Sequence, residues 1–203
     1  MITIVDYGMG NLGSVQNMLK RIGVQSQVTG DQHKIEQASK LLLPGVGAFD
    51  AAMQKINDTG LRTILDKKVL EEKVPVLGIC LGMQLLTDSS EEGKIPGLGW
   101  VPAATKKFNF PEGTLLKIPH MGWNTVQIVN SSPLTANFSA DSRFYFVHSY
   151  YVLVNNEADV LATTNFGINF HSIIQHKHIY GAQFHPEKSH KFGMLLLENF
   201  ARI

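Results

Sequence analysis

Cys80, the only cysteine of the chain, stands where a thiol could act as a nucleophile. An apolar run at residues 74–79 leads into Gly78-Ile-Cys80-Leu-Gly82, and a helical pattern starts at about residue 81. A strand that turns sharply into a helix lifts its central side chain above the sheet, and flanking glycines allow the tight turn. The partial positive charge at the start of the helix favours a thiolate. The alternative, a buried structural cysteine, leaves the two glycines unexplained.

A histidine and a carboxylate two residues apart, His185 and Glu187, could activate that thiol. On an extended segment, residues i and i+2 face the same side, and Pro186 between them stiffens the backbone. A carboxylate beside an imidazole holds its tautomer and stabilises the imidazolium, so the pair is a candidate base with its orienting group. The alternative is an accidental pair at the end of a surface strand. The following histidines lack such a partner: His148, His171, His176, His178 and His190.

A second glycine-rich turn, Gly45-Val46-Gly47, follows the apolar run that ends at Pro44. Glycines permit positive φ and let backbone N–H groups approach a ligand oxygen. Together with the N–H of Leu81, this turn is a candidate oxyanion hole. The alternative is an ordinary turn between a strand and a helix.

The segment Gly8-Met-Gly10-Asn-Leu-Gly13 formally matches a dinucleotide-binding fingerprint, with Asp31 as the acidic residue that would follow it. That motif is short and often matches by chance. Asp31 is expected to start a helix, whereas a ribose-binding acid should end the second strand. A dinucleotide site would also leave Cys80 and His185 without a role, so no cofactor is expected. No pair of histidines has a spacing typical of zinc, and no metal site is expected.

These side chains have to be positioned by an α/β fold, because strand and helix patterns alternate through the first half of the chain. Strands are expected at residues 2–6, 24–29, 40–43 and 74–79, and helices at 11–22, 31–38, 48–56, 61–72 and from about 81. Such alternation predicts a parallel sheet covered by helices on both faces. Pro44-Gly45 should end the third strand, and Asp31 should cap the second helix.

The second half of the chain, residues 100–183, consists of short β-branched and aromatic runs typical of antiparallel or mixed strands. Turns are expected at residues 122–124, 155–156 and 166–167, and an amphipathic helix at 189–200. We expect the added strands to extend one edge of the sheet. Residues 1–203 would then form a single three-layer domain around a mixed, mostly parallel sheet.

The composition is that of a globular protein, with 44% apolar and 17% charged residues. The net charge of +1 gives no basic surplus of the kind that nucleic-acid binding requires. The longest apolar runs, such as residues 40–46, are too short to span a bilayer. The first residues lack the basic region of a signal peptide, so the expected location is the cytoplasm.

Taken together, the motifs resemble those of the class I, triad-type glutamine amidotransferases over nearly the whole chain. The elbow around Cys80 and the segment His185-Pro-Glu187 are similar to the marks of the wide family. Within it, the chain is most similar to the glutaminase subunits of imidazole glycerol phosphate synthases. The segments that carry the resemblance are residues 6–14, 43–49, 78–84, 119–124, 148–150 and 183–189. The resemblance implies the three-layer, flavodoxin-like fold of that family.

The resemblance also implies a reaction. The Cys80 thiolate would attack the side-chain amide of L-glutamine and form a thioester with release of ammonia, and water would then hydrolyse the thioester to glutamate. His185 would transfer the protons and Glu187 would orient it. Gln84 and the backbone around Ser149 and Tyr150 would hold the head group of glutamine.

The same resemblance implies a heterodimer with a synthase subunit that is a (β/α)8 barrel. The ammonia would convert a phosphorylated ribulosyl intermediate into imidazole glycerol phosphate and an aminoimidazole carboxamide ribotide in histidine biosynthesis. The following residues would face the barrel: Asn11, Met121, Trp123 and Lys188. For Met121 and Trp123 the alternative is packing in the local core.

Other functions stay open at this point. The segment Gly97-Leu-Gly-Trp100 departs from the pattern of the histidine-pathway subunits, and a similar paralogous group supplies ammonia for amidation of a bacterial surface sugar. A non-catalytic scaffold of the same fold would have no need of Cys80, His185 and Glu187 together. A cysteine peptidase or other hydrolase of similar fold would not explain Gln84 or the partner-facing motifs.

Overall fold

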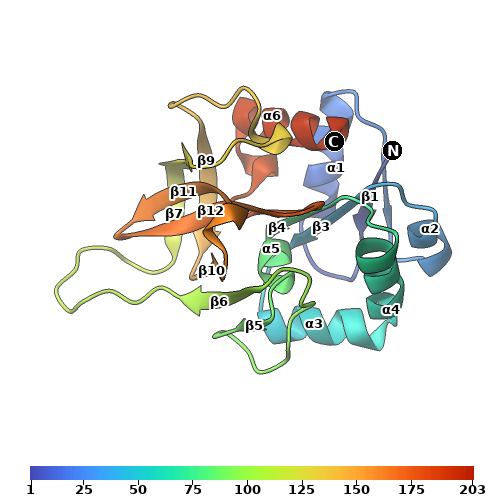
Figure 1. Cartoon of the computed structure of the whole chain (residues 1–203), viewed down its shortest axis with the longest axis horizontal. Coiled ribbons are helices and arrows are strands. Elements are labelled where there is room, and N and C mark those ends of the chain that lie inside the picture. The colour runs from blue at the N-terminus through green and yellow to red at the C-terminus, as the bar shows by residue number, and fades with distance from the viewer.

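A mixed β-sheet forms the middle layer of the molecule, and helices cover both of its faces (Figure 1). The computed structural model describes residues 1–203. The strands are β1 (Ile2–Val5), β2 (Ser26–Thr29), β3 (Leu41–Gly45), β4 (Val76–Cys80), β5 (Ser89–Ser90), β6 (Ala103–Lys107), β7 (His120–Thr125), β8 (Gln127–Ile128), β9 (Arg143–His148), β10 (Tyr150–Val154), β11 (Val160–Phe166), β12 (Ile168–His176) and β13 (Ile179–Ala182). The α-helices are α1 (Leu12–Arg21), α2 (Gln32–Glu36), α3 (Phe49–Asp58), α4 (Leu61–Asp66), α5 (Leu81–Leu85) and α6 (His190–Arg202).

The main sheet has the strand order β2-β1-β3-β4-β13-β12-β10-β6-β5, with β11 paired to β12 and β8 paired to β11. From β2 to β13 all neighbouring strands are parallel. From β13 through β12 and β10 to β6 they are antiparallel. Strands β7 and β9 pair only with each other. The predicted α/β class with a mixed sheet is therefore confirmed, and the second half extends the sheet on the β13 side.

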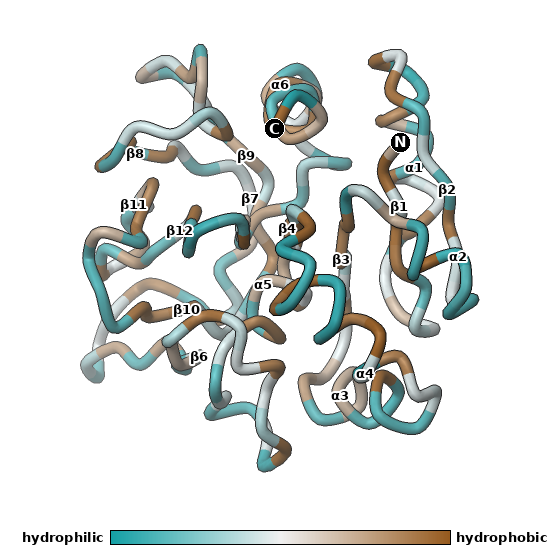
Figure 2. The backbone as a smooth tube through the Cα atoms, turned by 45° about the vertical axis from the view of Figure 1, so that its right-hand side comes forward, coloured by the Kyte–Doolittle hydropathy of each residue, from teal (hydrophilic) through white to brown (hydrophobic).

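Two apolar clusters lie on opposite faces of this sheet. Helices α3 and α4 pack on one cluster, and α1 and α6 pack on the other (Figures 1 and 2). Successive side chains of a strand point to opposite faces, so Leu41 and Leu43 enter the first cluster whereas Leu42 enters the second. Brown, hydrophobic stretches run along β1 and β4 in Figure 2. Burial on both faces explains why these strands read as continuous apolar runs.

Two local predictions were wrong. Residues 122–124 form no turn, because cross-strand pairing of Trp123 with Tyr145 keeps them in β7. Pro44-Gly45 does not end β3 early, since both residues still pair with β4. In both cases tertiary contacts override a local propensity. The helix expected at residues 61–72 is confirmed, as α4 followed directly by a π-helical turn, Lys67–Glu71.

The strand order already determines where a site can form. Strand β4 lies between β3 and β13 and is parallel to both, so the carboxyl ends of the three strands meet at one edge. In open α/β sheets, ligands bind at this edge. The turn after β3, the elbow after β4 and the segment after β13 are the three segments that carry the predicted site residues.

Candidate active site

Cys80 ends β4 in a strained backbone conformation, with φ of 54° and ψ of −112°. The strain follows from the sharp turn into α5, which begins at the next residue. A Cβ atom at Gly78 would lie 2.7 Å from the carbonyl oxygen of Gly82, and one at Gly82 would overlap the carbonyl oxygen of Leu43. The two glycines are thus required by close backbone approach. Helix α5 is only five residues long.

His185 and Glu187 follow β13 and contact each other directly. The distance from His185 Nδ1 to Glu187 Oε1 is 2.8 Å, and each side chain is 3% exposed. The expectation of a fully extended segment was wrong, because Pro186–Lys188 forms a 3-10 turn. His185 itself is extended and its N–H donates to Tyr145 O, whereas Glu187 is brought back by the turn. The hydroxyl of Ser189 donates to His185 O at 2.6 Å and holds the turn closed.

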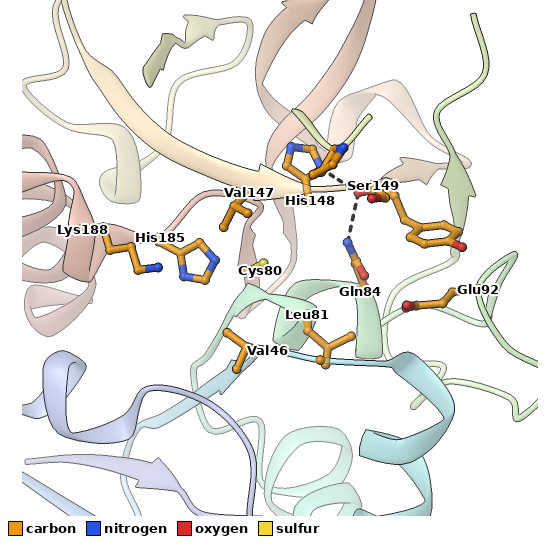
Figure 3. A pocket seen from close by; sticks show the side chains of 13 residues that line it. Val46, Cys80, Leu81, Gln84, Glu92, Val147, His148, Ser149, His185 and Lys188 are labelled. Carbon is orange, nitrogen blue, oxygen red and sulfur yellow. Dashed lines mark hydrogen bonds between the residues drawn. The ribbon is translucent and has the colours of Figure 1, made fainter. Parts of the chain in front are cut away.

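The charge state of His185 depends on two neighbours. Burial by itself lowers the pKa of His185, but Cys80 and Glu187 outweigh burial and raise that pKa to about 10. The Nε2 atom of His185 is buried and has no hydrogen-bond partner within the chain. Figure 3 shows its ring beside Cys80, and both residues line one pocket. An imidazolium next to a cysteine stabilises the thiolate form.

A pocket of about 360 Å³ opens in front of Cys80 (Figure 3). The residues that line it are Val46, Gly47, Cys80, Leu81, Gln84, Glu92, Pro119, Val147, His148, Ser149, Tyr150, His185 and Lys188. Most of the residues predicted from the sequence are therefore brought together here. Gly45 and Glu187 are not part of the lining. Gly45 directly precedes Val46 in the sequence and Glu187 is hydrogen-bonded to His185, and both of these neighbours line the pocket. A volume of this size suits a small ligand such as a free amino acid.

The glycine-rich turn lies beside the elbow because Gly45 pairs with Cys80 across β3 and β4. A Cβ atom at Gly45 would lie 2.5 Å from the Tyr7 hydroxyl, which itself donates to Pro44 O at 2.7 Å. Gly47 has φ of 108°, a conformation that favours glycine. Val46, at the tip, is 43% exposed and reaches the pocket.

Gln84 lies on α5 and contacts the inner wall of the pocket. Its Nε2 donates to Tyr150 O at 3.1 Å and to Gln183 Oε1 at 3.2 Å. Gln183 in turn places its Nε2 3.9 Å from Cys80 Sγ. Gln183 was not singled out from the sequence, although it lies only two residues before His185.

Glu92 was also missed, and it is the only carboxylate that lines the pocket. One oxygen accepts the N–H of Phe49 at 3.1 Å. Burial raises the pKa of Glu92, and the charge of Asp50 acts in the same direction against the opposing Phe49 N–H. Glu92 lies in an irregular segment with no periodicity, so no sequence signal could have found it.

The residues expected at a partner surface are exposed. Met121 is 63% and Trp123 is 45% exposed, which removes the alternative of core packing for both. Trp123 stacks on His190 with ring centroids 5.5 Å apart, and Lys188 Nζ lies 5.6 Å from the Tyr145 ring centroid. Asn11 is exposed as well. Lys188 belongs both to this surface and to the pocket lining.

The dinucleotide alternative finds no support in the geometry. The side chain of Asp31 accepts the N–H of Lys34 at 3.1 Å and caps α2, so it does not point from the end of β2 toward a ligand. A Cβ atom at Gly10 would lie 3.3 Å from Pro44 O, which places this glycine segment against the turn after β3. No group of three or more His, Cys, Asp or Glu side chains is arranged to hold a metal ion. None of the helices is both long and apolar enough to cross a membrane.

Comparison with known proteins places this arrangement in a family. The model of the family "Glutamine amidotransferase class-I" matches residues 3–203. The chain belongs to the class-I glutamine amidotransferases. Close relatives agree with this assignment: the imidazole glycerol phosphate synthase subunit HisH 2 of Methanococcus maripaludis is 53% identical, with 100% of this chain and 99% of the relative covered. The corresponding subunit HisH of Bdellovibrio bacteriovorus is 48% identical over 100% of both chains.

Solved structures support the fold of this amidotransferase. A crystal structure described as a glutamine amidotransferase superposes with a TM-score of 0.75 at 18% identity, over 100% of both chains. At that identity the likeness concerns the fold alone. It agrees with the three-layer arrangement of the class-I amidotransferases that the sequence motifs implied.

Proposed function

We propose that this amidotransferase is the glutaminase subunit of an imidazole glycerol phosphate synthase, acting as one domain over residues 1–203. It hydrolyses L-glutamine to glutamate and ammonia, and it passes the ammonia to a synthase subunit for histidine biosynthesis. The observation that carries the proposal is that Cys80 and His185 line one pocket at the ends of the adjacent strands β4 and β13, with Glu187 hydrogen-bonded to His185. The two relatives described above are imidazole glycerol phosphate synthase subunits, which favours this acceptor over a surface sugar.

The reaction begins with attack of Cys80 Sγ on the carbonyl carbon of the glutamine side-chain amide. His185 donates a proton to the amide nitrogen and the C–N bond breaks. Ammonia departs, and the acyl group remains bound to Cys80 as a thioester. A water molecule then attacks the thioester carbonyl while His185 accepts its proton. The C–S bond breaks, and glutamate is released. The raised pKa of His185 suits the first step, because the ring is protonated at neutral pH.

Two backbone segments stabilise the oxyanion that forms in each step. The N–H of Leu81 lies at the start of α5, directly after the nucleophile, and the turn Gly45-Val46-Gly47 lies opposite it across β3 and β4. Fixed backbone donors in a buried site cost no reorganisation during the reaction. One such donor typically contributes about 3 kcal/mol to transition-state stabilisation.

The charged head group of glutamine is held on the other side of the pocket. Its α-ammonium group pairs with the Glu92 carboxylate, which burial leaves short of solvent and therefore in need of a cation. Gln84 and the backbone of Ser149 and Tyr150 contact the same end. Such contacts bind ground state and transition state alike, so they set the KM for glutamine more than the kcat.

The partner is a (β/α)8-barrel synthase subunit that forms a heterodimer with this chain. It contacts the surface defined by Asn11, Met121, Trp123 and Lys188. Exposed Trp and Met side chains are typical anchors of protein interfaces. Because Lys188 also lines the pocket, the partner would cover the side from which ammonia leaves. No cofactor or metal is required by this chemistry.

An experiment that measures glutamine hydrolysis and ammonium-dependent synthesis separately tests the proposal. The chain and its cognate synthase subunit are purified together, and the Cys80→Ala variant is compared with the wild-type complex. We expect the variant to lose glutamine hydrolysis while the synthase still makes its product from added ammonium chloride. Failure of the wild-type complex to release glutamate from glutamine would refute the proposal, as would loss of the ammonium-dependent reaction in the variant.

A further inference from the structure

Two buried histidines outside the proposed triad form a hydrogen-bonded pair next to the pocket. His120 on β7 and His148 on β9 are directly paired in the register of these strands, and each is less than a tenth exposed. The distance from His120 Nδ1 to His148 Nε2 is 3.1 Å. A buried pair of this kind needs a reason, because polar groups are kept in a core only when they are satisfied.

The direction of every bond in this pair follows from its two ends. His148 Nδ1 lies 2.7 Å from Tyr150 O, and a carbonyl can only accept, so His148 carries its proton on Nδ1. His148 Nε2 must then accept from His120 Nδ1. His120 Nε2 in turn accepts from the Asn124 side-chain amide at 3.2 Å. All three bonds therefore point the same way, from β7 toward Tyr150, and both rings are neutral.

The surroundings hold both rings in place and keep them neutral. His120 is stacked between Phe146 and Phe166, with ring centroids 4.7 Å and 4.2 Å away. His148 contacts the Phe108 and Phe170 rings. Burial lowers the pKa of His120 to about 4 and that of His148 to about 3. Protonation of either ring would break the one-way order of the bonds.

At one end, this series of hydrogen bonds reaches the proposed substrate pocket. Tyr150 O accepts hydrogen bonds from both His148 Nδ1 and Gln84 Nε2, and Figure 3 shows both bonds. Gln84 Nε2 also contacts Gln183 Oε1, and Gln183 Nε2 lies 3.9 Å from Cys80 Sγ. The Tyr150 carbonyl is thus the point at which the histidine pair meets the residues around the nucleophile.

At its other end, the series of hydrogen bonds reaches the exposed strand β7. The side-chain Nδ2 of Asn124 donates to His120 Nε2 and to Asn165 O, and its Oδ1 accepts a hydrogen bond from the N–H of Thr125. The neighbouring positions of the same strand are Met121 and Trp123, which are exposed. The two histidines are therefore a direct polar connection between this surface strand and the pocket.

We propose that His120 and His148 are positioning residues that set the place of the Tyr150 carbonyl and, through it, of Gln84 in the glutamine pocket. This inference rests on the proposed glutaminase function. His148 forms part of the pocket wall and His120 lies behind it, but neither ring takes part in the reaction. Its effect is to fix one acceptor, so that the Gln84 side chain is held in the orientation that the head group of glutamine requires.

Three substitutions separate positioning from packing. His148→Phe keeps a buried ring and removes the donor to Tyr150 O. His148→Asn places an amide nitrogen near the position of Nδ1 and restores that donor. His120→Phe keeps the stacking between Phe146 and Phe166 and removes the donor to His148. His171→Phe is the matched control, because His171 is also a buried strand histidine. Its hydrogen bond is from the Val154 N–H, and it has none with His120 or His148.

Two readouts are measured on the full-length complex with its synthase subunit. The first is the KM and kcat for glutamine hydrolysis. The second is the alkylation rate of Cys80 by a glutamine-shaped electrophile, 6-diazo-5-oxo-L-norleucine, compared with iodoacetamide. The first reagent needs the head-group contacts, whereas iodoacetamide needs only an accessible thiol. A general loss of structure would change both alkylation rates, but misplacement of Gln84 would slow the glutamine-shaped reagent alone.

For His148→Phe we expect KM to rise about tenfold, in line with the loss of one well-placed hydrogen bond, and kcat to change little. Its reaction with the diazo reagent should slow by a similar factor at an unchanged iodoacetamide rate. His148→Asn should lie close to wild type, and His120→Phe between the two. If His148→Phe does not fold, His120→Phe alone still decides the matter.

Unchanged KM in both phenylalanine variants would overturn the inference, as would an equal rise in the His171→Phe control. So would parallel changes in the two alkylation rates. These results leave the proposed function intact, because the wild-type complex would still hydrolyse glutamine. A wild-type complex without glutaminase activity would instead refute the proposed function itself.

Discussion

Gly45 is directly paired with Cys80 in the register of the adjacent parallel strands β3 and β4. The glycine-rich turn and the nucleophile therefore leave the sheet at the same level, although 34 intervening residues separate them in the printed sequence. Such pairing leaves no room for a side chain at Gly45, where the Tyr7 hydroxyl and the backbone of Gly82 are in the way. Main chain rather than a side chain therefore lies next to Cys80 at this position.

Gly82→Ala should disrupt the elbow. The added Cβ would overlap the Leu43 carbonyl oxygen, which belongs to a buried strand and cannot move aside. We expect the free energy of unfolding to fall by about 3 kcal/mol, and glutaminase activity to be lost. Urea unfolding measures the change. Gly13→Ala is the matched control, because a Cβ there meets nothing within 4 Å, and this exchange in a helix should stabilise by about 0.5–1 kcal/mol. Equal stability of the two variants would contradict the close approach.

Glu187→Gln should shift the pH dependence of glutamine hydrolysis. The carboxylate favours the protonated form of His185 and helps to raise the pKa of His185 to about 10. Its removal lowers that pKa, so the alkaline fall of kcat/KM, which should lie near pH 10 in the wild type, moves to lower pH. The rate at neutral pH should drop about a hundredfold, because orientation of the ring is also lost. Glu198→Gln, at a half-buried position of α6 where Glu198 pairs with Arg202, is the control and should keep the wild-type profile. An unshifted alkaline limb in Glu187→Gln would count against the pairing.

Glu92→Gln should weaken glutamine binding more than turnover. The half-buried carboxylate is replaced by a neutral group of the same shape, so the proposed charge pair with the α-ammonium group is lost. We expect KM to rise about thirtyfold with less than a threefold change in kcat, which is the pattern of a lost ground-state contact. Its neighbour Glu91 pairs with Lys106 outside the pocket, so Glu91→Gln should leave KM unchanged. The same KM in both variants would exclude Glu92 from head-group binding.

Trp123→Ala should weaken association with the synthase subunit. Trp123 is 45% exposed and stacks on His190, which makes it a rigid apolar anchor on β7. Its truncation should cost about 2 kcal/mol of binding free energy, or roughly a thirtyfold rise in Kd. Calorimetric titration with the synthase subunit measures this change. Val129→Ala is the control, since Val129 is 54% exposed but lies outside β7. A Kd that responds equally to both would place the interface elsewhere.

Several features of the site follow from short-range sequence patterns. The elbow could be predicted because Gly78, Cys80 and Gly82 act on one another within a single turn, where spacing determines contact. His185 and Glu187 lie two residues apart, so almost any local conformation that turns them inward lets them meet. Even here the turn at Pro186–Lys188 was mistaken for an extended segment, because the bond from Ser189 to His185 O is not visible in a pattern of residue types.

Other members of the site have no local signature. Glu92 and His148 reach the pocket from segments that, taken alone, look like a polar loop and an ordinary strand. The Gly122-Trp123-Asn124 segment looked like a turn, yet pairing with β9 keeps it in a strand and leaves Trp123 exposed. Contacts of this kind are decided by partners more than twenty residues away, which no window of sequence contains.

The amino-acid sequence by itself determined the alternating α/β pattern, the strained thiol at the end of a buried strand and the chemistry that a thiol, an imidazole and a carboxylate can perform. Only the tertiary structure decided that β4 lies between β3 and β13, which brings Gly45, Cys80 and His185 to one edge. It also decided that two neutral histidines join β7 to the Tyr150 carbonyl. The physical reason is that spacing along the chain sets contacts over one or two turns, whereas strand order depends on burying apolar faces of the whole sheet at once.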